Sequence, residues 1–424
     1  MAKHKKKKVN HHHLEKVARA QHKNEYYRKI RKVLHALNCD SIFSMIPNGD
    51  LEALYTLRFQ SVNITIAEGE RMPAGARKYT SKFISEALKE KTVKLLPDGA
   101  EVDLDTYLTA GITMMYWALG LDEDKYAKAA QIKKDLNYFC TNEKIKTDAW
   151  STIHAIVQSA VMAFSDLNKR LYYGVFKPDV SGTKMKACHL LDWHSVIPER
   201  VYFQVNGERH NAVRVGHCSM NDGPKWVSVK AKNLGVHSAN PDKEFPVYIQ
   251  AHALQRIAER NDCVYSETLN VYLYCSLQAV KCQRQLSSGK FLIDFEVVDV
   301  KTGYLLADII DDKLIIRTFL FMTQEGMPES DKLKELTGLQ RSDIQYLDLD
   351  KLSTFMTTEV HENPRIRKLF ADAGCDCIFK LREIIEKYDI PIKKHPAATL
   401  LEKYIGLDDA NKFFAEEEME RKAG

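Results

Sequence analysis

The sequence predicts an α+β fold, in which a mainly antiparallel sheet with a packed helix is flanked by N- and C-terminal helical regions. Apolar residues recur at helical spacing as far as about residue 171. Between about residues 185 and 322 they alternate or form β-prone runs, and beyond Gly326 the helical spacing returns. The hydrophobic period therefore divides the chain into a basic arm and helix (1–38), a mainly helical domain (39–180), an α+β domain (181–325) and a C-terminal helical region (326–424).

The first 180 residues are expected to be mainly helical. Residues 12–37 are predicted to be helical, and their polar middle indicates either two helices or one helix extended into solvent. Asn48-Gly49-Asp50 forms a turn that caps a helix from Leu51, and a short strand is expected at residues 61–67. Further helices are predicted at residues 74–91, 104–119, 124–139 and 148–171, before turn residues at 177–183 that mark a domain boundary.

The α+β domain begins where the hydrophobic period changes to two. VYFQVNGERHNAVRVG predicts a hairpin with its turn at Asn206-Gly207, and KWVSVKAKNLG predicts another strand. A helix follows at residues 247–260, and further strands, or a short helix and strands, are expected at residues 269–280, 290–300, 304–311 and 313–322. The C-terminal helices are predicted at residues 329–336, 349–357, 364–373, 377–388 and 397–405.

Composition indicates a globular protein, with 45% hydrophobic and 28% charged residues in 424. No run of about 18 apolar residues exists, and the N-terminus is charged where a signal peptide needs an apolar stretch. We therefore expect a cytoplasmic protein without membrane contact. Nine scattered cysteines lack the pairing of a disulfide framework and the spacing of a zinc site, so reduced thiols are expected and neither a metal nor a cofactor is predicted.

The positive charge is concentrated at the N-terminus. Twelve Lys or Arg and two Glu lie in the first 33 residues, so the rest of the chain is net acidic although the whole chain carries +5. An arm of this kind attracts nucleic acid without sequence preference and in a salt-dependent manner. The predicted nucleic-acid-binding residues are Lys5, Lys6, Lys7, Lys8, Arg28, Lys29, Arg31 and Lys32. The alternative is a solubilising tail with no specific role.

The segment FPVYIQAHALQRIAERN carries the candidate chemistry of the α+β domain. In a helix, His252, Arg256 and Arg260 project from one face because they are four residues apart. One imidazole and two guanidiniums can bind a phosphate diester, stabilise its developing charge and move a proton without a metal. The alternative is a solvated helix face with ordinary mixed charge.

An HAxxRIxER helix followed by several strands, one with a basic residue next to a hydroxyl, resembles the barnase/EndoU/colicin/RelE-like ribonucleases, which include toxin- and phage-associated members. The resemblance covers about residues 245–323. It implies a bacterial or phage origin, a metal-independent endoribonuclease domain and RNA as the partner. Carried over to this sequence, the catalytic residues are His252, Arg256 and Arg260 on the helix, with Arg317 and Thr318 on a late strand.

In the mechanism that the resemblance implies, His252 is general acid or base, Arg256 and Arg260 clamp the phosphate, and Arg317 with Thr318 stabilises the pentacoordinate oxygens. The late strands carry no second histidine, so Glu259 or water has to supply the other proton transfer. The rival function is a non-catalytic protein that binds nucleic acid or a protein partner through its basic arm. An inhibitory or scaffold protein is the second expected class of partner.

Other chemical motifs have little support in the sequence. It contains no GxxxxGK[ST], GxGxxG, HExxH or GxSxG pattern, so P-loop, dinucleotide, zincin and serine-hydrolase sites are not predicted. ACHLLDWHS brings Cys188, His189, Asp192 and His194 together in sequence and is interpreted as a turn with internally satisfied side chains.

Overall fold

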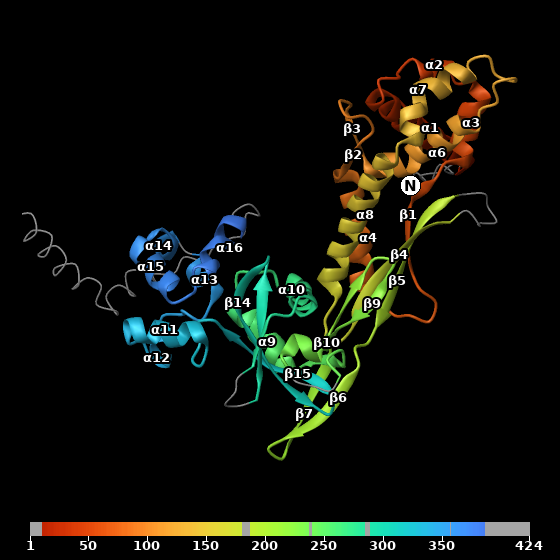
Figure 1. Ribbon diagram of the computed structural model, residues 1–424. Coiled ribbons are helices and arrows are strands. Elements are labelled where there is room, and N and C mark those ends of the chain that lie inside the picture. Colours follow the sequence, from red (N-terminus) through yellow and green to blue (C-terminus); the bar gives the residue numbers. More distant parts are fainter. Residues whose placement is uncertain (1–10, 180–186, 237–239, 285–288, 357, 386–424) are drawn as a thin grey trace, which may run out of the picture. The chain divides into compact units, whose positions relative to one another are not determined.

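The structure is a computed structural model that describes residues 11–179, 187–236, 240–284, 289–356 and 358–385 (Figure 1). The fold is α+β, with mainly antiparallel sheets and helical regions towards both ends, as the sequence predicts. The chain folds into two compact units. Unit 1 contains the described residues of Met1–Phe164, Tyr172–Ser195 and Cys218–Gly223, and unit 2 contains those of Ser165–Leu171, Val196–His217 and Pro224–Gly424.

These units differ from the four predicted parts. The basic helix belongs to the same unit as the helices that follow it, and the first strands after residue 170 also belong to unit 1. The α+β and C-terminal helical parts share unit 2. The predicted helix at 397–405 lies outside the described residues.

Unit 1 is mainly helical. Its helices are α1 (His11–Ala36), α2 (Ile42–Met45), α3 (Asn48–Leu57), α4 (Ala74–Glu90), α5 (Leu104–Thr106), α6 (Ile112–Leu119), α7 (Ala129–Thr141) and α8 (Glu143–Phe164), and the π-helix η1 (Tyr107–Gly111) joins α5 to α6. The central helix is α8, because it buries Ile145, Ile153, Val157 and Val161 at helical spacing. The short strands β2 (Thr92–Lys94) and β3 (Glu101–Asp103) form an antiparallel pair.

A three-stranded sheet completes unit 1. Strand β1 (Gln60–Ile66) runs parallel to β5 (Cys188–Val196), and β4 (Leu171–Asp179) lies on the other side of β5. Gly174 lets β4 approach α8, since a Cβ there would lie 2.7 Å from Leu191 Cδ1 and 3.0 Å from Val157 Cγ1. Strands β8 (Gly216–Ser219) and β9 (Gly223–Trp226) form a separate pair, whose residues are divided between units 1 and 2.

Two predictions around β4 and β5 were wrong. The helix predicted to reach Leu171 ends at Phe164, because Asp166 forms a turn in which its carboxylate accepts from Asn168 N–H and its carbonyl from Arg170 N–H. The aromatic run that follows then forms β4. The segment from Cys188 to His194 is a strand and not a turn. Every second side chain as far as Trp193 is buried, as expected of a strand that packs one face on the core.

Unit 2 is built on one large sheet. Its strands are β6 (Arg200–Val205), β7 (Glu208–Arg214), β10 (Ser228–Lys230), β11 (Glu244–Ile249), β12 (Cys282–Arg284), β13 (Phe291–Val297), β14 (Val300–Ile310) and β15 (Lys313–Phe321). Their order is β12-β13-β14-β15-β11-β7-β6, with β10 beside β11. Among these pairs only β11 and β15 run parallel, so the sheet is mainly antiparallel as predicted.

The helix that carries His252 follows β11 directly. This helix, α9 (Ala251–Arg260), packs on β15 with Ala253 and Ile257 buried, and α10 (Ser266–Gln278) packs on β13. A 3-10 turn, η2 (Ala231–Leu234), follows β10. The C-terminal helices are α11 (Pro328–Thr337), α12 (Arg341–Tyr346), α13 (Leu352–Phe355), α14 (Thr358–Glu362), α15 (Pro364–Asp372) and α16 (Cys377–Ile385).

Candidate nucleic-acid interface

The three predicted catalytic residues of α9 have different surroundings. His252 is exposed and makes no hydrogen bond, ion pair or ring contact with any residue that the structure describes. Arg256 Nη1 donates to Glu259 Oε2 at 2.8 Å. Arg260 forms an ion pair with Asp350, and the two side chains are only 12% and 2% exposed. The guanidinium of Arg260 is therefore held by a buried carboxylate and does not face solvent beside His252.

Arg317 and Thr318 lie on β15, the strand on which α9 packs. Arg317 Nε donates to Gln250 Oε1 at 3.1 Å, and its Nη1 lies 3.4 Å from Asp308 Oδ2. Its Cζ is 5.5 Å from the ring centre of Phe203, which belongs to a buried cluster containing no described residue of α9. Thr318 Oγ1 makes only a long contact, 3.5 Å, with the Phe319 carbonyl. The five predicted catalytic side chains are thus not gathered in one cluster of contacts.

The predicted nucleic-acid-binding residues of α1 do lie together. Tyr26, Ile30, Val33 and Leu34 form the buried stripe that packs α1 into unit 1. Arg28, Arg31 and Lys32 are exposed on the remaining surface, and Lys29 is half-buried beside them. Lys5, Lys6, Lys7 and Lys8 lie outside the described residues.

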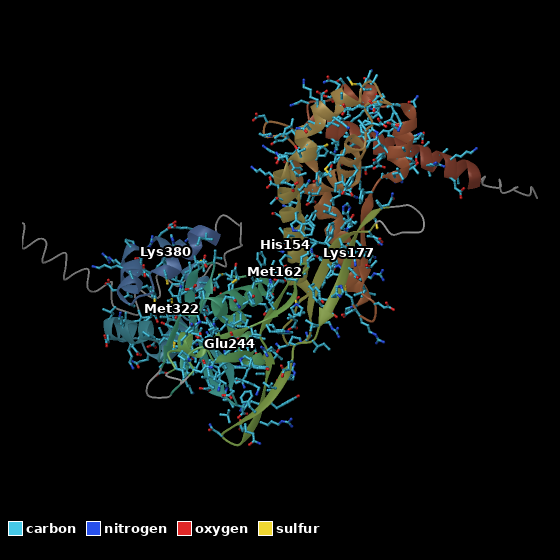
Figure 2. All side chains as sticks on the ribbon, turned by 45° about the vertical axis from the view of Figure 1, so that its right-hand side comes forward. His154, Met162, Lys177, Glu244, Met322 and Lys380 are labelled. Carbon is cyan, nitrogen blue, oxygen red and sulfur yellow. The ribbon has the colours of Figure 1, made fainter. Side chains whose placement is uncertain are left out.

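The first turns of α1 carry further exposed cations. Residues 14–22 are all exposed, among them Lys16 and Arg19, and Figure 2 shows this red end of the ribbon extending away from the other helices of unit 1. Even the apolar residues Leu14 and Val17 are 52% and 40% exposed there. Of the two predicted alternatives, the structure therefore has a single helix extended into solvent.

A groove of about 950 Å³ runs beside α1. Its lining includes all four predicted cations of the helix together with Lys89 from the end of α4. It also contains acidic side chains, notably Asp103 and Asp105. The groove therefore has mixed charge. A cation that is already paired with a carboxylate is less able to bind an anionic ligand than one that has no partner.

Two of the groove's cations have no partner among the described residues, namely Arg28 and Lys89. Arg31 is exposed and lies over the Phe43 ring, with Cζ 3.9 Å from its centre. Lys32 Nζ is 3.4 Å from Asp103 Oδ2, and its side chain is 68% exposed. A long contact of this kind on an exposed lysine is weak, so Lys32 can exchange it for a phosphate.

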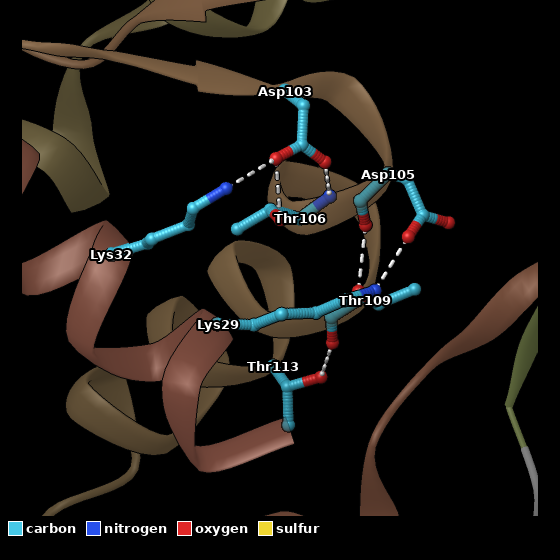
Figure 3. Close-up of polar contacts among 7 residues, drawn as sticks. All are labelled: Lys29, Lys32, Asp103, Asp105, Thr106, Thr109 and Thr113. Carbon is cyan, nitrogen blue, oxygen red and sulfur yellow. Dashed lines mark hydrogen bonds and ion pairs between the residues drawn. The ribbon is translucent and has the colours of Figure 1, made fainter. Parts of the chain in front are cut away.

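Asp103 is fixed by the start of the next helix. Its Oδ1 accepts from Thr106 N–H and its Oδ2 from the Thr106 hydroxyl, both at 2.8 Å, as expected of an N-cap (Figure 3). Burial acts to raise the pKa of Asp103, but the hydrogen bonds from Thr106 and the charge of Lys32 outweigh it and hold the pKa below the ordinary value. Asp103 therefore stays ionised.

Lys29 and Asp105 form the inner end of the groove. Lys29 Nζ is 2.5 Å from Asp105 Oδ2 and 3.2 Å from Thr109 Oγ1, and the Thr109 hydroxyl donates to the Asp105 carbonyl at 2.6 Å (Figure 3). The π-helix η1 begins two residues after Asp105. Single π-turns inside helices often occur at functional sites, and this one places Thr109 beside Lys29.

Sequence reasoning found the cations of α1 but missed Lys89, Asp103 and Asp105. The signal for Asp103 was an aspartate directly before the predicted helix at 104, which is the preferred position of an N-cap. Nothing in the sequence indicated that residues about 75 positions apart meet at Lys29.

The polar cluster of Cys188, His189, Asp192 and His194 is not arranged as a metal site. In the ranges that the structure covers, no group of three or more His, Cys, Asp or Glu side chains is placed to hold a metal ion. His189 is buried, and His194 stacks on Tyr173 with 4.9 Å between the ring centres.

Comparison with models of known protein families, with curated proteins and with solved structures finds no significant match. The resemblance to the ribonuclease group therefore stays a prediction. Within the described ranges, none of the helices combines the length and the apolar character needed to cross a membrane.

Proposed function

We propose that this protein binds nucleic acid, with RNA as its principal partner, through the α1 cationic surface. This surface consists of Arg28, Arg31 and Lys32 on α1 and Lys89 on α4. The proposal rests on one observation: cations from two separate helices line one groove. Two of them, Arg28 and Lys89, have no partner in the described structure. The sequence predicted the cations of α1 but not Lys89. We propose a cytoplasmic location as well, as expected from the charged N-terminus of the sequence.

The physical basis is the release of counterions. Each phosphate neutralised by Lys or Arg frees condensed cations, and this supplies affinity without reading the sequence. Arg28 and Lys89 need break no ion pair to meet a phosphate, whereas Lys29 would have to leave a half-buried contact with Asp105. Lys16 and Arg19, exposed on the first turns of α1, add positive charge outside the groove. Lys5 to Lys8, in the arm before α1, are expected to strengthen the same attraction.

Binding is favoured over catalysis by the arrangement in unit 2. A metal-free cleavage needs two proton-transfer groups and a phosphate clamp around one point. Here Arg260 is paired with buried Asp350, and Arg317 is held by Gln250 and Asp308. We therefore propose the non-catalytic function. A scaffold protein is the class of protein partner that fits this function, whereas an inhibitory partner belongs to the ribonuclease function.

The test is the salt dependence of binding to a labelled single-stranded RNA of mixed sequence, measured by fluorescence anisotropy. Wild type should bind with an affinity that falls steeply as salt rises. The double variant Arg28→Gln, Lys89→Gln should bind more weakly, and the slope of log K against log salt should decrease by about 1.4, because each lost phosphate contact removes about 0.7 for a single strand.

The matched control removes the same charge elsewhere in unit 1. Lys125→Gln with Lys146→Gln changes two lysines that pair with Asp122 and Glu143, away from the groove lining. This control should keep the wild-type slope. Equal slopes for the two double variants would contradict the proposal. RNA cleavage by wild type that is lost in His252→Ala would instead restore the ribonuclease function.

A further inference from the structure

A smaller cavity of about 190 Å³ opens beside the groove in unit 1. Its lining includes Lys29, Arg58, Asp105 and Thr109, and the rings of Tyr26 and Phe59 supply apolar surface. Since a water molecule occupies about 30 Å³ of liquid, the cavity has room for a group much larger than water. Lys29 and Asp105 also line the groove, so the two spaces adjoin.

Asp105 is the distinctive group of this cavity. Its side chain belongs to a residue that is only 8% exposed, yet it lines the cavity, the groove and a third space of about 240 Å³ beside β1 and α4. Its Oδ2 is paired with Lys29 Nζ, whereas Oδ1 accepts no hydrogen bond from the described residues (Figure 3). A carboxylate oxygen that lines a cavity and has no donor can accept a hydrogen bond from a ligand that brings an N–H or O–H group.

The charges that line the cavity are mixed. Asp105 and Glu25 line it together with Lys29, Arg58 and Lys89, and Lys29 is already paired with Asp105. The ammonium of Lys29, which lies 2.5 Å from the other carboxylate oxygen, Oδ2, is a donor, so the free acceptor Oδ1 and this donor belong to one ion pair. Such a pair matches the edge of a neutral ring that carries an amino group next to a ring acceptor.

The Arg58 guanidinium forms one wall in a fixed position. It donates to the Tyr55 carbonyl, and its Cζ lies 4.0 Å from the Tyr55 ring centre. A planar guanidinium held in this manner offers a surface on which a base can stack.

We infer that this cavity takes one unpaired, amino-bearing nucleobase of the bound strand, while the phosphates on either side lie on the α1 cationic surface; the inference rests on the proposed function. The amino group donates to Asp105 Oδ1, and Lys29 donates to the adjacent ring nitrogen. Cytosine and adenine fit this description. In uracil the one ring N–H lies between two carbonyl oxygens, which Asp105 would repel.

The experiment compares labelled oligo(C), oligo(A) and oligo(U) of equal length in the same anisotropy assay. Wild type should bind the first two roughly tenfold more tightly than oligo(U), as expected for one good side-chain contact to a base edge. Asp105→Asn, which removes the charge but keeps the size, should bring this ratio to one or below, because the amide can donate to uracil carbonyls.

Asp103→Asn is the matched control. It makes the same charge change two residues away, lines the groove but not the cavity, and keeps the N-cap because asparagine caps as well as aspartate. This variant should keep the wild-type ratio. If Asp105→Asn does not fold by circular dichroism, Asp105→Glu keeps the charge, displaces the carboxylate by one methylene and should reduce the ratio.

Equal affinity of wild type for all three oligonucleotides, with the salt slope intact, would overturn the inference and leave the proposed function standing. A ratio that falls equally in Asp103→Asn and Asp105→Asn would also overturn it, because the effect would then belong to net charge. Failure to bind any of the three would overturn both proposals.

Discussion

At the scale of single residues, surroundings decide what a charged side chain can do. Arg260 and Arg28 are both arginines on helix surfaces that the sequence marks as cationic. Arg260 meets the buried carboxylate of Asp350, which would be left uncompensated if Arg260 turned to a ligand, at a cost of about 3 kcal/mol or more. Arg28 has no such partner in the described structure. The first is therefore structural and the second is available for binding.

His189 illustrates the same principle for a neutral side chain. It is buried between Phe59 and Phe176, with ring centres 4.9 and 5.6 Å away, and its Nδ1 has no hydrogen-bond partner in the described structure. Burial lowers the pKa of His189 to about 4. The uncharged imidazole is thus part of the core of unit 1.

We predict that His189 makes the stability of unit 1 depend on pH. Between pH 6.5 and about 4 the unfolded chain binds a proton that the folded chain excludes, so stability is full above pH 6.5 and is lost as the pH falls through this window. The contribution is about 3 kcal/mol. Urea unfolding followed by tryptophan fluorescence at several pH values should show it.

His189→Leu should flatten this pH dependence, whereas the exposed His252→Gln should leave it unchanged. A wild-type profile that is flat between pH 6.5 and 4, or a His189→Leu profile as steep as wild type, would contradict the assignment.

At the scale of elements, the local sequence was enough to predict a turn that requires positive φ angles. The β6–β7 hairpin turns at Asn206 and Gly207, whose φ angles are +52° and +82°, so both central residues are left-handed. The dipeptide Asn-Gly predicts this turn because these residues tolerate positive φ. A Cβ on Gly207 would meet no atom within 4 Å, so only the backbone restricts this position.

Gly207→Ala should therefore destabilise the protein by about 1 kcal/mol, through the cost of a left-handed alanine alone. Asn206→Gly should be nearly neutral, because glycine adopts the same conformation freely. Urea unfolding of the three proteins measures both effects. A neutral Gly207→Ala would show that the turn adopts another form in solution.

At the scale of the whole molecule, the compact units are not continuous segments of the sequence. Unit 1 is made of three separate stretches, and its β1 pairs with β5, about 130 residues later. Gly174, from the second stretch, lies so close to Val157 of α8 and to Leu191 that a side chain there would clash with both. The helical part that precedes residue 165 is therefore incomplete without the later stretches.

A fragment of residues 1–164 should lack the stable core of unit 1, because β1 loses its partner and α8 loses the cover of β4. We expect it to melt at lower temperature, or with less cooperativity, than a fragment of residues 1–223 in circular dichroism. Equal melting of the two fragments would mean that the helices alone form the core.

The sequence by itself determined the α+β class, most helices and strands, the Asn-Gly hairpin and the cations of α1, since periodicity, turn residues and charge are properties of neighbouring residues. It did not determine that residues 171–179 form a strand of unit 1 or that Arg260 forms an ion pair with Asp350. Nor did it determine that Lys89, Asp103 and Asp105 line one groove with the cations of α1. Those facts depend on residues tens of positions apart. Only tertiary packing brings them together and sets which charges are paired, buried or free to bind.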